Sequence, residues 1–338
     1  MNTAWQIFLQ TIGATERNGD SAFVADPAAL TALDGRDVIM PLRPYGVLAV
    51  EGAGAEKFLQ GQLTCHVAET SPTLSTPGAY CTPKGRMVCS FQLARPSTDH
   101  FLLRMRRDLL DVASATLQKY IVFSKAKQQR VDDMIVIGLH GPNTGAMVRE
   151  LAGDIPGGKN RTLIHGEAVF IQRDADGTWF EYWAPSEQAL LFWNRYYERC
   201  TSAGSHYWRW LTIRSGEAEV CGATVEAFIP QMLNFHLTGA VNFKKGCYTG
   251  QEIVARAYYR GQVKRHLIRA AVAAAAPAPG TAVEDENRRG IGTIVDSVAI
   301  DSDHAELLAV SGIEENTDLK LLVDGVALQP LPLPYAIP

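Results

Sequence analysis

NFKKGCYTGQEIVAR, residues 242–256, is the most informative stretch of this chain. Within it, Thr249 and Glu252 have the spacing of a capping box, in which each side chain satisfies the backbone amide of the other residue. The pattern therefore predicts a helix that begins at Gly250. Glu252 and Arg256 are spaced four residues apart with the acid first, which is the order that stabilises a helix.

Cys247 lies two residues before the predicted N-cap residue, close to the exposed amides and the positive end of the helix dipole. Lys244 and Lys245 lie just before it. These three features favour a thiolate over a thiol, so we predict that Cys247 is a reactive thiol. The alternative is that Cys247 is a small buried residue that fills a turn.

The rest of the first three quarters of the chain reads as mixed α and β structure. Residues 47–50 and 134–139 are buried strands, and each precedes a glycine-containing turn and a helical pattern. Residues 86–93 and 101–105 read as the two strands of a hairpin. The chain therefore contains two related α+β lobes.

After residue 264 the pattern changes to short strand candidates without a convincing helix between them. A small all-β barrel or sandwich has this signature. The strand candidates are residues 267–272, 292–298, 305–310 and 319–323.

Composition limits the classes of protein that fit. The chain has 338 residues, enough for two or three domains, and 46% of them are hydrophobic. Lys and Arg number 32 against 36 Asp and Glu, so the net charge of −4 gives no overall attraction for nucleic acid or an anionic membrane. A directly bound RNA would need a local basic patch, and the cluster of Arg104, Arg106 and Arg107 is too small to predict one.

The six cysteines are scattered, and none forms a Cys-x-x-Cys pair or has a zinc-finger spacing from a histidine. We therefore expect free thiols in a reducing compartment and no metal site. The first residues lack a basic signal-peptide region, and no run approaches the about 18 apolar residues that a membrane span needs. These features predict a cytoplasmic location and no membrane partner.

The motif Lys-Lys-Gly-Cys-Tyr-Thr-Gly-Gln-Glu at residues 244–252, with the Ala-Arg that follows, resembles the signature of the YgfZ family of folate-binding proteins, relatives of the glycine-cleavage T-protein. Similar words occur along most of the chain: residues 58–64, 84–87, 120–125, 228–231 and 330–335. This resemblance implies two intertwined folate-binding α+β lobes and a C-terminal β-barrel around a central folate channel. It places the two lobes in residues 1–263 and the barrel in residues 264–338. The boundary between the lobes lies near residues 125–133, and a lobe can be built from separate segments of the chain.

The resemblance also implies which residues contact tetrahydrofolate or a derivative of it. Trp208 precedes residues 211–216, a predicted strand that ends in Ile-x-x-Gly, and matches a folate-contacting tryptophan of the family. Tyr45 stands where relatives have a second aromatic residue, usually Trp. Glu252 and Arg256 of the central motif are assigned as further cofactor contacts. The alternative for Trp208 is an ordinary core aromatic residue.

The T-protein relatives are aminomethyltransferases that use an aspartate, and this chain has Cys89 and Ser90 at that place. Neither residue replaces a carboxylate base, which argues against aminomethyl transfer. The resemblance instead implies a folate-binding accessory protein for assembly or repair of iron–sulfur clusters, with Cys247 as the reactive thiol. Its partners would be iron–sulfur carrier or client proteins, and it would support tRNA modification indirectly, without binding nucleic acid itself. A tetrahydrofolate-dependent aminomethyltransferase-like one-carbon enzyme and a ligand-binding scaffold without chemistry remain as alternatives.

Overall fold

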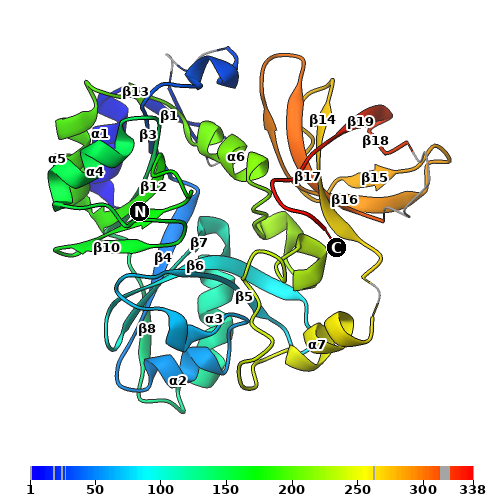
Figure 1. Cartoon of the computed structure of the whole chain (residues 1–338), viewed down its shortest axis with the longest axis horizontal. Helices are drawn as coiled ribbons and strands as arrows, with labels where there is room; N and C mark the ends of the chain where they lie inside the picture. Colours follow the sequence, from blue (N-terminus) through cyan, green and yellow to red (C-terminus); the bar gives the residue numbers. More distant parts are fainter. Residues whose placement is uncertain are drawn as a thin grey trace. The chain divides into compact units, whose positions relative to one another are not determined.

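The computed structural model describes residues 2–17, 20–23, 26, 28–261, 263–312 and 320–337 (Figure 1). The chain divides into two compact units, each built from several segments. Unit 1 comprises Met1–Gln60, His66–Pro77 and Phe91–Trp208, and unit 2 comprises Gly61–Cys65, Gly78–Ser90 and Arg209–Pro338. No helix in the described part of the chain is long and apolar enough to cross a membrane.

A mixed sheet of six strands, counted within the described residues, forms one half of unit 1. Its strand order is β10-β11-β12-β9-β3-β13, with antiparallel pairing except between β3 and β13. The strands are β3 (Val38–Pro41), β9 (Met134–His140), β10 (Thr162–His165), β11 (Ala168–Gln172), β12 (Trp179–Pro185) and β13 (Thr201–Ser202).

Helices cover one face of this sheet because each buries an apolar stripe against it. In α5 the buried residues are Ala189, Phe192, Trp193 and Tyr196, which share one helix face at the 3.6-residue period. They pack with residues of β9 and β12 in one core cluster. The helices of this layer are α1 (Thr3–Thr11), α4 (Thr144–Ala152) and α5 (Ser186–Tyr196).

A second sheet has the order β5-β6-β7-β4-β8, five strands among the residues described. It confirms the predicted hairpin, since β6 and β7 pair antiparallel through Phe91 and Met105. The predicted strand–turn–helix units are also present, as β4 with α2 and β9 with α4. The elements are β4 (Tyr45–Glu51), β5 (Thr76–Cys81), β6 (Met87–Ser97), β7 (His100–Arg106), β8 (Lys127–Arg130), α2 (Ala55–Gln60) and α3 (Leu110–Ile121).

Short elements complete unit 1. They are β1 (Ala14–Arg17), β2 (Asp20–Phe23), and the 3-10 turns η1 (Leu30–Leu33), η2 (Val67–Glu69) and η3 (Arg107–Leu109). Strands β5 and β6 run from one unit into the other, and so does α6 (Ser205–Arg214).

Unit 2 contains a closed β-barrel with the strand order β14-β17-β16-β15-β18-β19 in the described residues, which confirms the predicted C-terminal barrel. Its core consists of inward-facing aliphatic side chains such as Ile294 and Leu307. The elements of unit 2 are η4 (Gly222–Thr224), η5 (Pro230–Leu233), α7 (Gln251–Tyr259), β14 (His266–Val272), β15 (Ala282–Glu284), β16 (Gly290–Ala299), β17 (Ala305–Ser311), β18 (Leu322–Val323) and β19 (Val326–Leu331). The division into residues 1–263 and 264–338, with lobes meeting near 125–133, stays a prediction.

Candidate functional site

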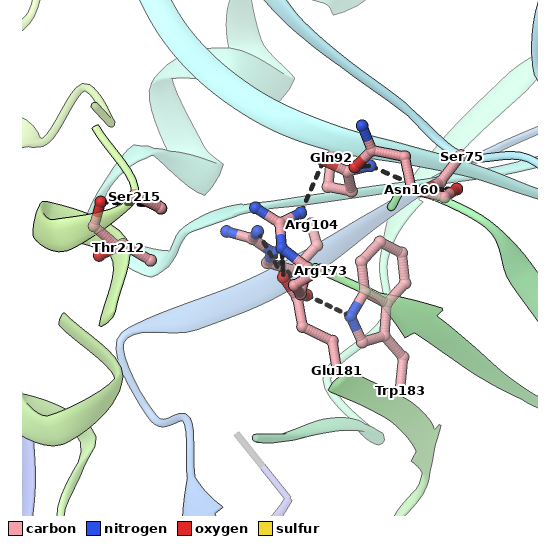
Figure 2. A network of polar contacts seen from close by, with 9 residues as sticks. All are labelled: Ser75, Gln92, Arg104, Asn160, Arg173, Glu181, Trp183, Thr212 and Ser215. Carbon is pink, nitrogen blue, oxygen red and sulfur yellow. Dashed lines mark hydrogen bonds and ion pairs between the residues drawn. The ribbon is translucent and has the colours of Figure 1, made fainter. Parts of the chain in front are cut away.

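Glu181 is the centre of a buried charged cluster in unit 1. Its neighbours Phe180 and Tyr182 belong to the helix-covered core, so strand alternation directs Glu181 to the opposite face of β12. Arg104 of β7 binds this carboxylate as a fork, with Nη2–Oε1 at 2.9 Å and Nε–Oε2 at 3.1 Å (Figure 2). Arg173 Nε lies 3.5 Å from Oε1. The cluster therefore holds two guanidinium groups around one carboxylate.

Neutral polar side chains extend the cluster away from Glu181. Arg173 Nη1 donates to Gln92 Oε1 at 3.0 Å, and Gln92 Nε2 donates to Ser75 Oγ at 2.7 Å and to Asn160 Oδ1 at 3.2 Å (Figure 2). Glu181 itself is 0% exposed, and both arginines are buried. Buried charges are stable only with partners, and here Glu181 and the polar side chains bind the two buried guanidinium groups.

Tyr45 and Trp208, the two residues predicted to contact folate, lie at opposite ends of this cluster. The Arg104 guanidinium carbon lies 4.1 Å from the Tyr45 ring centroid. At the other end, the Arg173 guanidinium carbon lies 5.7 Å from the Trp179 ring, whose centroid is 5.1 Å from that of Trp208. The structure thus joins Tyr45 and Trp208 through one chain of contacts.

The local structure around Trp208 differs from the prediction. Trp208 lies inside helix α6, and the predicted strand at residues 211–216 is the end of that helix and the turn after it. The Trp208 ring packs directly on β9, because a Cβ on Gly138 would lie 2.6 Å from the ring. Glycine at position 138 is what allows this close approach.

Two buried indole N–H groups have no hydrogen-bond partner among the described residues. They belong to Trp208, which is 1% exposed, and to Trp179, which is 6% exposed. An unpaired buried donor costs about 1–3 kcal/mol, and such groups are rare in folded proteins. The two rings have centroids 5.1 Å apart, so their N–H groups are candidate donors to one ligand with hydrogen-bond acceptors.

Among the cysteines of the described residues, Cys247 is the exposed one. It lies on a loop that hydrogen bonds from neighbouring loop residues hold in place. Beneath it Lys245 is buried, and its Nζ donates to the carbonyl oxygens of Leu63 at 2.6 Å and Cys65 at 2.9 Å. The backbone amide of Asn242 donates to the carbonyl of Thr64 at 3.0 Å. Residues 61–65 therefore form a cradle for the loop, and the thiol faces outward.

Burial controls the titration of the groups beneath the loop. It lowers the pKa of Lys245 to about 8, while the Lys245 Nζ also lies 5.0 Å from the Tyr248 ring centroid. Burial, and then the nearby Cys81, raise the pKa of the Tyr248 phenol, which keeps it neutral. Lys245 directs N–H groups to the cradle carbonyls, so backbone oxygens hold its ammonium group, and the cationic neighbour predicted for Cys247 stays a prediction.

The predicted capping box is wrong. Helix α7 begins at Gln251 with Gly250 as its N-cap residue, and no side chain caps it. Thr249 Oγ1 instead donates to Gln62 Oε1 at 3.2 Å. Gly250 has φ of 85°, and a Cβ there would lie 2.4 Å from the carbonyl oxygen of Thr82. Cys247 is therefore one residue further from the helix than predicted, which weakens the effect of the helix dipole on its thiol.

Glu252 and Arg256 form the predicted pair on α7, with Arg256 Nη2 at 2.7 Å from Glu252 Oε1. Both side chains are exposed, 81% and 62%. They belong to unit 2 together with Cys247, whereas Tyr45 and Trp208 belong to unit 1. In the described residues, no group of three or more His, Cys, Asp or Glu side chains is placed to hold a metal ion.

Comparison with known proteins identifies a relative that shows the family of this chain. The tRNA-modifying protein YgfZ of Enterobacter sp. (strain 638) is 32% identical over 314 residues, which cover 88% of this chain and 93% of that protein. The chain therefore belongs to the YgfZ family. No family model matches the sequence.

Among solved structures, the fold matches the glycine cleavage system aminomethyltransferase T from Bartonella henselae. The TM-score is 0.77 with 17% sequence identity, over 97% of this chain and 96% of that one. At this identity the match establishes the fold. This YgfZ family member thus has the T-protein fold predicted from its sequence.

Cys89 and Ser90 lack the properties of a general base. Burial raises the pKa of Cys89 to about 12, so its sulfur remains a neutral thiol. Ser90 Oγ accepts a hydrogen bond from the backbone amide of Val220 at 2.9 Å. Neither side chain can take over the role that the resemblance assigns to an aspartate in aminomethyl transfer.

Sequence reasoning missed Glu181, Arg173 and Trp179. It grouped Arg104 with Arg106 and Arg107 in a short basic cluster, and the structure buries Arg104 against Glu181. A signal was present, because Glu181 is the lone acid in the otherwise apolar strand Trp179–Pro185. A charge at a strand position that alternation turns inward needs a buried partner.

Proposed function

We propose that this YgfZ family protein binds tetrahydrofolate or a derivative and supports the assembly or repair of iron–sulfur clusters, with Cys247 as the thiol that reacts or contacts the cluster. Through cluster-dependent tRNA-modifying enzymes it would support tRNA modification indirectly. The observation that carries this proposal is the exposed thiol of Cys247 on a loop anchored by the buried Lys245. A thiolate is both a nucleophile and a soft ligand for iron.

The folate part of the proposal is supported by the cluster around Glu181. A pterin is a flat ring with several hydrogen-bond acceptors, and the unpaired N–H groups of Trp179 and Trp208 are donors on flat aromatic side chains. The guanidinium groups of Arg104 and Arg173 are further hydrogen-bond donors in the same cluster. Tyr45 borders the same cluster, so its phenol ring is a further candidate contact.

Folate titration tests this part. Trp208→Phe keeps a buried ring and removes the N–H, and we expect it to weaken tetrahydrofolate binding about fivefold or more, as loss of one hydrogen bond does. Trp193→Phe is the matched control, because Trp193 is buried in the helix-side core of the same unit. Tetrahydrofolate affinity that stays within twofold in Trp208→Phe and in Trp208→Ala would remove Trp208 from the site.

The iron–sulfur part is tested in cells. Activities of iron–sulfur enzymes are compared in cells that carry wild-type protein, Cys247→Ala or Trp208→Ala, and we expect both variants to lower them. Full activity with Cys247→Ala would favour a folate-binding scaffold without thiol chemistry. Turnover of tetrahydrofolate with an aminomethyl donor would instead favour the one-carbon enzyme, which the state of Cys89 and Ser90 disfavours.

A further inference from the structure

The segment around α7 is strongly basic in a protein that is acidic as a whole. Residues 243–266 contain six lysines and arginines and one acid, Glu252, whereas the net charge of the chain is −4. Lys245 is buried and Arg256 pairs with Glu252. The remaining four cations are exposed and form no ion pair within the described residues: Lys244, Arg260, Lys264 and Arg265.

Two tyrosines stand on the same part of the molecule. Tyr258 is 47% exposed and Tyr259 66% exposed, near the end of α7. Phe243 stacks on Tyr258 with ring centroids 3.9 Å apart and planes 16° apart, and Tyr259 meets Tyr258 edge-on at 5.0 Å. Because these rings support one another, they form a fixed aromatic platform. Tyrosine and arginine are the residues that dominate binding at protein interfaces.

A small groove adjoins this platform. Its volume is about 300 Å³. It is lined by the apolar side chains of Ile229, Met232, Ala257 and Val263, and by Gly261, Lys264 and Arg265. Ala257 immediately precedes Tyr258 in α7, so groove and platform are continuous. An apolar floor with a cationic rim fits an apolar side chain flanked by carboxylates.

We propose that the α7 surface, defined as Lys244, Tyr258, Tyr259, Arg260, Lys264 and Arg265, docks an acidic protein that inserts an apolar side chain into the adjoining groove. The inference rests on the proposed function, because the docked protein would exchange a cluster at Cys247. Phe243 and Lys244 belong to the same loop as this thiol. A protein bound there arrives beside the exposed thiol, as one that delivers or receives a cluster must. Charge complementarity steers its approach and makes association dependent on salt.

The groove favours a protein over RNA. Exposed aromatic rings with nearby cations also suit single-stranded nucleic acid, whose bases stack on such rings. A base in a pocket is additionally read through donors and acceptors at its edges, whereas the described side chains of this groove are four apolar groups and the donors Lys264 and Arg265, with no acceptor. An apolar side chain requires no such partners.

The first test measures binding of fluorescein-labelled peptides by anisotropy. The probe is a peptide of glutamates and serines around one phenylalanine, compared with its Phe-to-Ala and Glu-to-Lys versions and with oligouridylate RNA. We expect the acidic Phe peptide to bind wild-type protein at least about tenfold more tightly than the others. The protein variant Tyr259→Ala/Lys264→Glu should lose this advantage, and the control Tyr120→Ala/Lys127→Glu, which changes exposed residues of unit 1, should keep it.

Two results would overturn the proposal. One is tighter binding of oligouridylate that the α7 variant abolishes, which would assign the surface to RNA. The other is equal affinity of the acidic Phe peptide for wild-type protein and the α7 variant.

The second test separates this inference from the proposed function. In cells, Tyr259→Ala/Lys264→Glu should lower iron–sulfur enzyme activities while tetrahydrofolate affinity of the purified variant stays within twofold of wild type. If this variant restores full activity and Cys247→Ala does not, the docking surface is wrong and the proposed function stands. If Cys247→Ala also restores full activity, the proposed function is wrong, and the peptide measurement alone decides the docking surface.

Discussion

The Glu181 cluster and the Cys247 loop hold buried charge in different ways. Around Glu181, two guanidinium groups and a carboxylate bind one another inside unit 1. Beneath Cys247, the Lys245 ammonium binds carbonyl oxygens of the 61–65 segment. The first arrangement depends on the charge of a single residue, and the second depends on backbone geometry. Removal of a charge should therefore be the change that destabilises the Glu181 cluster most. A change in backbone freedom should be the one that destabilises the Cys247 loop most.

The largest effect is expected for Glu181→Gln. This substitution keeps the shape of the side chain but removes the buried negative charge that binds two buried guanidinium groups, which should lower the free energy of unfolding by about 3–5 kcal/mol. Urea unfolding measures this loss. The matched control is Glu252→Gln, which breaks an exposed pair worth about 0.3–0.5 kcal/mol. Equal shifts for the two variants would show that burial does not distinguish these carboxylates.

Gly250→Ala should have the next largest effect. Gly250 has φ of 85°, and a Cβ would lie 2.4 Å from the Thr82 carbonyl oxygen, so alanine must displace backbone. A strained backbone position costs about 1–3 kcal/mol, which thermal unfolding would detect. Gly246→Ala is the control in the same loop, because a Cβ there meets no atom within 4 Å. Unchanged stability of Gly250→Ala would mean that the backbone around Gly250 and Thr82 can move to accept a Cβ atom at little cost.

A smaller, pH-dependent effect is expected for Lys245. Burial lowers its pKa to about 8 from 10.5. Between these values the unfolded chain binds more protons than the folded one, so this group makes the free energy of unfolding rise with pH in that window. Relative to Lys245→Met, wild-type protein should therefore gain stability from pH 7.5 to pH 9.5. The exposed Lys244→Met variant should show no such trend, and a flat difference for Lys245→Met would contradict the assignment.

The sequence predicted the parts of the fold that depend on local periodicity. The strand–turn–helix units, the β6–β7 hairpin and the barrel follow from alternation and helical spacing over a few residues. The failures involve distant partners. Thr249 bonds to Gln62, 187 residues away, in place of the predicted cap. Glu181 and Arg104 are 77 residues apart, and no local pattern links them.

The sequence also predicted some features of the candidate site and missed others. Cys247 is exposed as a reactive thiol requires, and Tyr45 and Trp208 meet one cluster, although their roles remain predictions. Trp208 was expected before a strand because the family resemblance implies a strand at residues 211–216, which include the short run Leu211 to Ile213. The structure makes this run helical, since a short apolar run has the same local pattern in a buried helix and a buried strand.

The smallest effect on stability is expected for Cys247→Ser. An exposed side chain contributes little to folding, so the free energy of unfolding should change by less than about 0.5 kcal/mol. Its effect on thiol chemistry should be large, because burial raises the pKa of both Cys81 and Cys89 and keeps them unreactive in the folded protein. Titration with a disulfide reagent should lose its fastest-reacting thiol in Cys247→Ser and keep it in Cys89→Ser, while the partly exposed Cys200 and Cys221 react more slowly in both. A fast phase that survived in Cys247→Ser would show that the most accessible sulfur belongs to another cysteine. The anchored loop would then not carry the thiol chemistry proposed for it.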